Sequence, residues 1–166
     1  LLDADTLLRQ VYEAARVISY ASDVTWREVG RVLRSRAVRP RLRAMLGGGK
    51  PVAERSPLAE GVVEQDGEVV LARAARPDRD PVLPLRAAAA AAQAGLPLSL
   101  HAVRRMAAHA RPLPTPWPAE AREQLVTLLG SGPSTVDVWE ALEAEGLITQ
   151  LLPDWERVRC RPQRNA

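Results

Sequence analysis

The side chains of this chain that most often serve catalysis or metal binding are two histidines and one cysteine. His101 and His109 stand eight residues apart on a predicted helix, which separates them by about 12 Å of rise. That distance is too long for a shared metal ion, so we expect both at the surface. Cys160 has Arg159 and Arg161 beside it, which favours a thiolate, but neither histidine lies near it in sequence as a base. We therefore expect a buried or merely tolerated thiol.

A glycine-rich segment, Gly47-Gly48-Gly49-Lys50, suggests a phosphate-binding loop at first sight. Its spacing differs from that of a nucleotide-binding P-loop, and Pro51, which follows the lysine, has no N–H to donate. The Asp and Glu residues show no paired spacing for acid–base catalysis, and solvated faces and helix caps account for them. The sequence therefore predicts no catalytic, cofactor-binding or metal-binding residue.

One basic run accounts for the formal net charge of +3. It contains six arginines and no acidic residue, and the rest of the chain has a formal charge of −3 without it. Such a run could track phosphates, but no aromatic side chain after Trp26 is interleaved for base stacking. We expect a solvated segment, with weak anion binding as the alternative, and no general nucleic-acid site. The six residues are Arg31, Arg34, Arg36, Arg39, Arg41 and Arg43.

The composition favours helices around a core that is built mainly from aliphatic side chains of small and medium size. The chain of 166 residues is 46% hydrophobic but contains no Phe, so Leu, Val, Ala and Trp must fill the core. No apolar run approaches the roughly 18 residues that a membrane span needs, and a single cysteine excludes an internal disulfide framework. Leu1 opens inside an apparent amphipathic helix, with no signal peptide, as in a piece of a longer chain. We expect the core to be anchored by Trp26, Trp117, Trp139 and Trp155.

Hydrophobic spacing predicts one long helix at the start of the chain. From residue 4 to about 35, apolar residues recur at steps of three and four, and Pro40 is expected to close the region. Residues 36–60 are rich in Arg, Gly and Pro, which predicts a flexible linker. Asp66-Gly67 then joins two Val-rich arms, residues 61–65 and 68–72, and this pattern predicts a β-hairpin.

Shorter helices separated by Gly and Pro are predicted for the remainder. Ser99 is the expected cap of one of them, and Gly95 the expected end of another. The fold class is therefore mainly α, a bundle-like helical domain with one long N-terminal helix and a small β-hairpin. The expected helices cover residues 84–93, 99–110, 119–129, 134–145 and 147–152, with a last one from 153. The predicted divisions are the long helix (1–36), the insertion (37–60), the hairpin with its helices (61–152) and a closing segment (153–166).

Three stretches resemble the middle of the bacterial PII uridylyltransferase/uridylyl-removing enzymes. The first runs from Gly61 to Leu71, the second from Asp80 to Arg86, and the third from Trp117 to Arg122. The closing run from Trp139 to Asn165 is the most specific, since it resembles the junction that precedes the HD hydrolase domain of the family. The resemblance is strong from Gly61 onward, fair up to Arg36, and absent from the insertion.

This resemblance implies a function for a longer enzyme. Enzymes of the family transfer UMP from UTP to the PII signalling protein and later hydrolyse it off, in response to glutamine. Transfer depends on Mg²⁺ held by paired aspartates of a nucleotidyltransferase domain, removal on an HD domain, and glutamine sensing on ACT domains. None of these motifs is present here, so no catalytic residue can be assigned. The resemblance implies that residues 1–36 extend the transferase side, that residues 153–166 start the hydrolase side, and that the enzyme is cytoplasmic.

Two alternatives remain open from the sequence. One is the helical region of the related glutamine-synthetase adenylyltransferases, although the Arg-Cys-Arg-Pro-Gln-Arg-Asn tail favours the uridylyl family. The other is a non-enzymatic helical interaction module that binds anions weakly through the arginine run. In the first interpretation, the partners are the PII protein and neighbouring domains of the same chain, while UTP and glutamine bind elsewhere.

Overall fold

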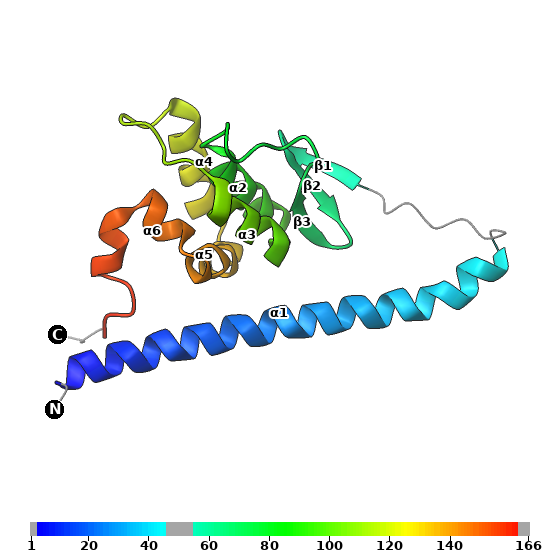
Figure 1. Cartoon of the computed structure of the whole chain (residues 1–166), viewed down its shortest axis with the longest axis horizontal. Coiled ribbons are helices and arrows are strands. Elements are labelled where there is room, and N and C mark those ends of the chain that lie inside the picture. The colour runs from blue at the N-terminus through cyan, green and yellow to red at the C-terminus, as the bar shows by residue number, and fades with distance from the viewer. Residues whose placement is uncertain (1–2, 46–54, 163–166) are drawn as a thin grey trace.

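The chain folds into a helical body with a small sheet and a long helix that runs alongside it (Figure 1). The computed structural model describes the backbone of residues 3–45 and 55–162, and the side chains of residues 3–34 and 55–162. Within these ranges the fold is mainly α, with one long N-terminal helix and one small sheet, which confirms the predicted fold class.

Helix α1 spans Ala4–Met45. The Asp3 carboxylate begins it by accepting hydrogen bonds from the backbone N–H groups of Asp5 and Thr6, at 2.9 and 3.0 Å. The prediction that the helix ends near residue 35, with Pro40 closing the region, is wrong, because the helix continues to Met45. Proline removes one backbone hydrogen bond, but the Arg, Ala, Leu and Met residues around Pro40 all have high helix propensity.

The sheet has three antiparallel strands in the order β1-β2-β3: β1 (Arg55–Ala59), β2 (Val62–Gln65) and β3 (Glu68–Leu71). The predicted hairpin is confirmed, with Asp66 and Gly67 at φ of 56° and 79°, as a type I′ turn requires. The linker prediction is wrong for residues 55–59, which form β1 and pair with β2. The Gly47–Lys50 segment lies outside the described residues.

Helix α2 (Leu83–Ala94) is the centre of the body, and its alanine run is almost completely buried. Because alanine side chains are short, neighbouring elements approach α2 closely. Gly95 ends the helix at a φ of 63°, as predicted. The next segment runs along the free edge of β3, where the Val69 N–H donates to the Pro97 carbonyl at 2.9 Å and the Ser99 N–H donates to the Val69 carbonyl at 2.9 Å.

The remaining helices follow the predicted order closely. They are α3 (Leu100–His109), α4 (Ala119–Leu129), α5 (Ser134–Ala144) and α6 (Leu147–Leu151), followed by a short 3₁₀ helix, η1 (Pro153–Arg157). Ser99 caps α3 as predicted, since its Oγ accepts a hydrogen bond from the Ala102 N–H at 3.2 Å. Helices α4 and α5 both pack on α2. The sheet, α2, α3 and α5 are among the elements that enclose one main core.

Three of the four tryptophans pack against the core. The Trp139 and Trp155 rings meet edge to face with centroids 5.1 Å apart and lie against the main core, while Trp117 lies against a smaller cluster of Val82, Leu85 and Ala121. The prediction for Trp26 is wrong, because this side chain on α1 is 72% exposed. The described chain therefore leaves most of the Trp26 side chain uncovered.

Candidate functional site

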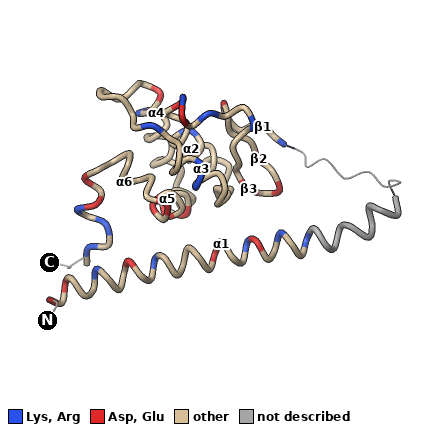
Figure 2. The backbone as a smooth tube through the Cα atoms, viewed as in Figure 1, with Lys and Arg blue, Asp and Glu red and all other residues tan. Residues whose placement is uncertain are grey.

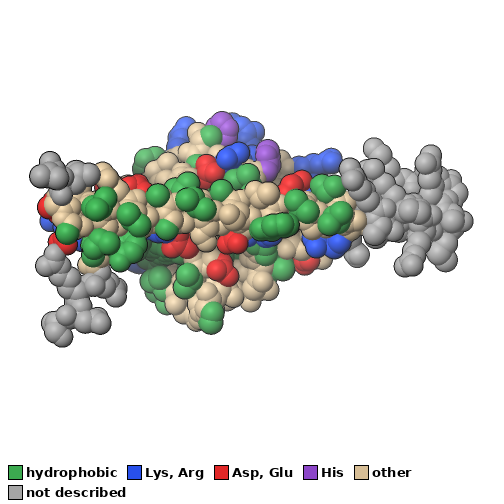
Figure 3. All heavy atoms as spheres, turned by 90° about the horizontal axis from the view of Figure 1, so that it is seen from below, with side chains coloured by type: hydrophobic (Ala, Val, Ile, Leu, Met, Phe, Trp, Pro, Cys, Tyr) green, Lys and Arg blue, Asp and Glu red, His purple; other side chains and the backbone are tan. Residues whose placement is uncertain are grey.

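Helix α1 carries most of the large hydrophobic residues that the described chain leaves exposed, and most of these lie on its outer face. Figure 3 looks onto this helix from below and shows hydrophobic side chains spread along its length. Most of them recur at spacings of three, four and seven residues along one side of α1, over about 40 Å from Leu7 to Leu33, whereas Val17 lines a small pocket on the side that faces α5 and Arg159. The exposed large hydrophobic residues of α1 are Leu7, Leu8, Val11, Tyr12, Val17, Ile18, Trp26, Val29, Val32 and Leu33.

The inner face of α1 meets the body through polar side chains. Arg16 pairs with Glu140 of α5 at 2.8 Å, and Arg27 lies 4.0 Å from Glu68 of β3. Figure 2 shows acidic and basic residues distributed along the stretch of α1 that runs beside the body. None of the described residues of α1 is buried. The helix is therefore held to the body by charges at partly exposed positions, and such pairs are individually weak.

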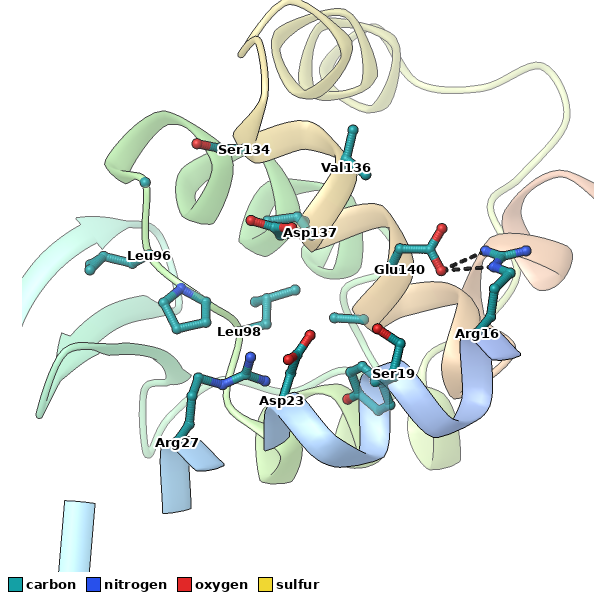
Figure 4. Close-up of a pocket in the computed structure, with 15 residues that line it drawn as sticks. Arg16, Ser19, Asp23, Arg27, Leu96, Leu98, Ser134, Val136, Asp137 and Glu140 are labelled. Atoms are coloured by element: carbon teal, nitrogen blue, oxygen red, sulfur yellow. Dashed lines mark hydrogen bonds and ion pairs between the residues drawn. The ribbon is translucent and has the colours of Figure 1, made fainter. Parts of the chain in front are cut away.

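A cleft of about 540 Å³ separates the middle of α1 from α5 and the segment after Gly95. Arg16, Ser19, Asp23 and Arg27 rise into it from α1, as Figure 4 shows. The opposite wall combines Leu96, Pro97, Leu98, Val136, Asp137 and Glu140. The cleft thus mixes both signs of charge with an apolar floor.

Tyr20 lies beside this cleft with its hydroxyl group buried. The hydroxyl has no hydrogen-bond partner among the described residues. Burial raises the pKa of Tyr20, and the nearby Glu145 adds to this effect. Tyr20 therefore stays protonated at neutral pH and gives the inner face of α1 a neutral, partly buried contact between its charged pairs.

The tail of the chain, which comprises η1 and residues 158–162, meets α1 and α5 at a second group of charges. Arg159 lies 2.9 Å from Glu143 of α5 and 3.2 Å from Glu13 of α1. Arg16 donates a hydrogen bond to the Cys160 sulfur at 3.4 Å. We call Glu13, Arg16, Glu143, Arg159 and Cys160 the tail junction.

Burial differs strongly within the tail junction. The Glu143 side chain is only 4% exposed, and its ion pair with Arg159 lacks the alignment of a hydrogen bond. Burial raises the pKa of Glu143, and the charges of Arg159 and Arg16 offset this only in part. Burial alone would lower the pKa of Arg159, but the hydrogen bond to Glu156 and the charge of Glu143 hold it above its usual value. Arg159 is therefore the cation that compensates the buried carboxylate.

Arg86 forms a second ionic network inside the body. Its side chain is 8% exposed and contacts Asp80 at 2.6 Å and Glu120 at 2.5 Å. It also donates to the Glu60 carbonyl at 3.3 Å. Burial would lower the pKa of Arg86, yet the hydrogen bonds to Asp80 and Glu120 raise it. The network joins the loop before α2 to the start of α4, so its role is to hold the fold.

The residues that the sequence singled out do not converge in space. His101 and His109 lie exposed on α3, as expected, and Cys160 is half-buried in the tail junction. Arg31 pairs with Glu28 on the surface of α1, and Arg34 is exposed as well. The side chains of the later arginines in the run lie outside the described residues. No three His, Cys, Asp or Glu residues among those described come close enough to hold a metal ion.

Sequence reasoning missed the inner face of α1 and the tail junction. A signal was present, since Arg9, Arg16 and Asp23 recur at intervals of seven and therefore share a side of the helix. This side lies apart from the apolar stripe. Their partners on α5 and in the tail could not be identified, because those contacts join residues far apart in sequence.

In the part of the chain that the structure describes, no helix combines the length and the hydrophobicity needed to cross a membrane. The described chain is thus a helical segment whose chemistry consists of ion pairs, a cleft and a long apolar face. This arrangement is typical of a module that packs against other protein parts.

Comparison with known proteins places this module in a family. The chain is 88% identical, over its full length, to a bifunctional uridylyltransferase/uridylyl-removing enzyme of Streptomyces coelicolor. It is 43% identical over 98% of its length to the enzyme of the same name from Mycobacterium tuberculosis, and 38% identical over 64% of its length to that of Corynebacterium glutamicum. The chain belongs to the family of bifunctional uridylyltransferase/uridylyl-removing enzymes.

The chain spans about a fifth of the length of these curated relatives, with 20% and 19% coverage of the first two and 15% of the third. No family model matches the sequence. No solved structure matches it either. The family assignment therefore rests on the sequence identity to these relatives.

Proposed function

We propose that this chain is an interdomain helical segment of an enzyme that attaches UMP from UTP to the PII signalling protein and removes it by hydrolysis. The segment supplies structure and couples the two activities, and the catalytic residues lie elsewhere in the enzyme. The 88% identity to a bifunctional relative over the whole chain supports the assignment to such an enzyme. The contrast between the two faces of α1 supports the coupling role.

The way in which α1 is exposed supports the proposed coupling role. Its outer face presents large hydrophobic side chains from Leu7 to Leu33, and its inner face carries the ion pairs to the body. Rotating the helix to bury the stripe would break those ion pairs. The stripe is therefore available to the transferase side of the enzyme, while the tail after η1 leads toward the hydrolase side.

The ligands of the enzyme are assigned to regions outside this chain. Mg²⁺ is assigned to the transferase part of the enzyme, and the described residues offer no group of three or more His, Cys, Asp or Glu that could hold a metal ion. UTP and glutamine would bind elsewhere as well. The PII protein and the neighbouring domains of the same polypeptide are the proposed partners of the segment.

Activity of the purified chain tests the non-catalytic role. Incubated with UTP, Mg²⁺ and PII protein, it should transfer no UMP, and with uridylylated PII it should release none. A full-length enzyme of the family serves as the positive control. Turnover by the 166 residues alone would refute the proposal.

Two matched variants in the full-length enzyme test the coupling role. Ile18 on the outer face of α1 and Val126 on α4 are 66% and 69% exposed, so neither belongs to the core of the body. Ile18→Glu should change the response of both activities to glutamine by several-fold, because it places a charge in the proposed contact. Val126→Glu should leave that response unchanged. Equal behaviour of the two variants would contradict the proposed role of this face.

A further inference from the structure

We propose that Arg159 is a positioning residue that fastens the tail to α1, so that the first helix and the end of the chain move as one unit. This inference rests on the proposed function, because it names the residues through which one side of the segment would sense the other. It concerns the tail junction defined above, where contacts bridge more than 140 positions of sequence.

The contacts lie on one side of the first turns of α1. Arg9, Glu13 and Arg16 follow each other at steps of four and three, so they share one face of the helix. Arg9 donates to the Glu156 carbonyl at 2.8 Å, Glu13 pairs with Arg159 at 3.2 Å, and Arg16 reaches the Cys160 sulfur at 3.4 Å. The tail is thus bound at three successive positions along the helix.

Arg159 differs from the other members because it serves three carboxylates at once. It pairs with Glu13 of α1, with Glu143 of α5 and with Glu156 of η1, the last at 3.1 Å. Loss of Arg159 would leave the buried Glu143 carboxylate without its nearest counter-charge, which is far more costly than loss of an exposed pair. Among the contacts that hold the tail on α1, the one made by this guanidinium group is therefore expected to contribute most.

The start and the end of the tail segment are fixed in different ways. At its start, the Trp155 ring packs edge to face on Trp139 and against the main core. At its end, the charges of the junction carry the contact with α1, since no described α1 residue is buried. A shift of α1 therefore has a direct path to the tail that does not pass through the core.

Cys160 provides a built-in probe of this contact, because it is the only cysteine of the chain and is half-buried at the junction. Its rate of reaction with a thiol reagent such as DTNB reports how often the tail leaves α1. In the complete chain, Arg159→Gln should accelerate the reaction at least tenfold. Because the sulfur is half-buried beside Arg16, acceleration indicates that the tail has left α1.

Two further variants make the test independent of misfolding. Arg157→Gln is the matched control, since Arg157 lies in the same segment but is 81% exposed and pairs only with the exposed Asp154. It should react like the wild type. Glu13→Gln changes α1 and leaves the tail sequence intact, and it should accelerate the reaction about threefold, as expected for one exposed pair.

The double variant, with Glu13→Gln and Arg159→Gln together, completes a double-mutant cycle. If Arg159 links the tail to Glu13, then Glu13→Gln should add nothing in the Arg159→Gln background. Full additivity, or wild-type reactivity in Arg159→Gln with the far-UV circular dichroism unchanged, would overturn the inference and leave the proposed function standing. If Arg159→Gln releases the thiol but a full-length enzyme with this change keeps its glutamine response, the junction is supported and the coupling role fails.

Discussion

At the scale of single residues, the sequence segments that carry the family resemblance are joined by polar contacts inside the fold. Arg86 and Asp80 come from one segment and Glu120 from another, and the three side chains form a single ion network. Trp139 and Trp155 belong to the closing run, and their rings pack edge to face. The resemblance therefore reflects residues that hold the body together.

Replacing Arg86 should destabilise the body strongly. Arg86→Ala leaves Asp80 and Glu120 without their shared cation, and we expect a loss of about 2–3 kcal/mol in the free energy of unfolding. Urea denaturation followed by circular dichroism measures this loss. Arg79→Ala is the control, because Arg79 is 76% exposed and lies 4.0 Å from Asp78. A similar loss in both variants would contradict the role assigned to the network.

The buried Glu143 should make stability depend on pH. Because burial raises its pKa above the ordinary value of 4.5, the folded chain holds this proton more tightly than the unfolded chain. The contribution of Glu143 to stability is thus fully present below pH 4.5 and is lost as the pH rises through the raised pKa. The charged residues near Glu143 are Glu140, Arg16 and Arg159. They are unchanged in Glu143→Gln, so their effects cancel when the two proteins are compared.

Unfolding free energies of the wild type and of Glu143→Gln, measured by urea titration from pH 4 to pH 8, test this dependence. The stability of the wild type relative to the variant should fall as the pH rises. A difference that stays constant over the whole range would show that the proton on Glu143 is not linked to folding.

At the scale of secondary structure, turn and cap residues made most of the body predictable. Asp66-Gly67, Gly95 and Ser99 mark element ends through their own conformational preferences, and the structure agrees with each. Strand β1 was missed because Arg55-Ser56-Pro57-Leu58-Ala59 lacks β-branched residues, and Pro57 is tolerated only because β1 is an edge strand. The exposure of Trp26 was missed because burial depends on what lies opposite a side chain, and sequence does not show this.

The hairpin turn should respond to substitution according to backbone conformation alone. A side chain added at Gly67 meets no atom within 4 Å, but the φ of 79° disfavours L-residues other than Asn and Asp. We expect Gly67→Ala to cost about 1 kcal/mol in unfolding free energy, and Gly67→Asn clearly less. Thermal denaturation of the two variants compares these costs. Equal losses would mean that the turn conformation is not the determining factor.

At the scale of the whole molecule, the chain consists of a body with its own core and a helix whose described side chains, residues 4–34, add no buried residue to that core. The buried hydrophobic residues among those described run from Val62 to Ile148. The candidate site could be predicted only in outline for this reason. The apolar stripe of α1 is visible in the sequence, whereas its polar partners belong to distant elements.

The body should fold without the first 54 residues. A chain that starts at Arg55 keeps the whole buried core, so we expect cooperative thermal unfolding with a Tm lowered by less than about 8 °C. For comparison, Leu83→Ala in the complete chain removes a fully buried side chain and should cost about 2–5 kcal/mol. A truncated chain that fails to unfold cooperatively would show that α1 is part of the folding unit.

The attachment of α1 has a mechanical consequence. Its contacts with the body and the tail run from Arg9 to Arg27, which lies 4.0 Å from Glu68, and the helix continues to Met45, about 27 Å further along its axis. With the contact at Arg27 as the pivot, a tilt of about 10° would move the far end by about 5 Å. The helix thus has the geometry of a lever arm, which amplifies small rearrangements of ion pairs into large displacements at a distance.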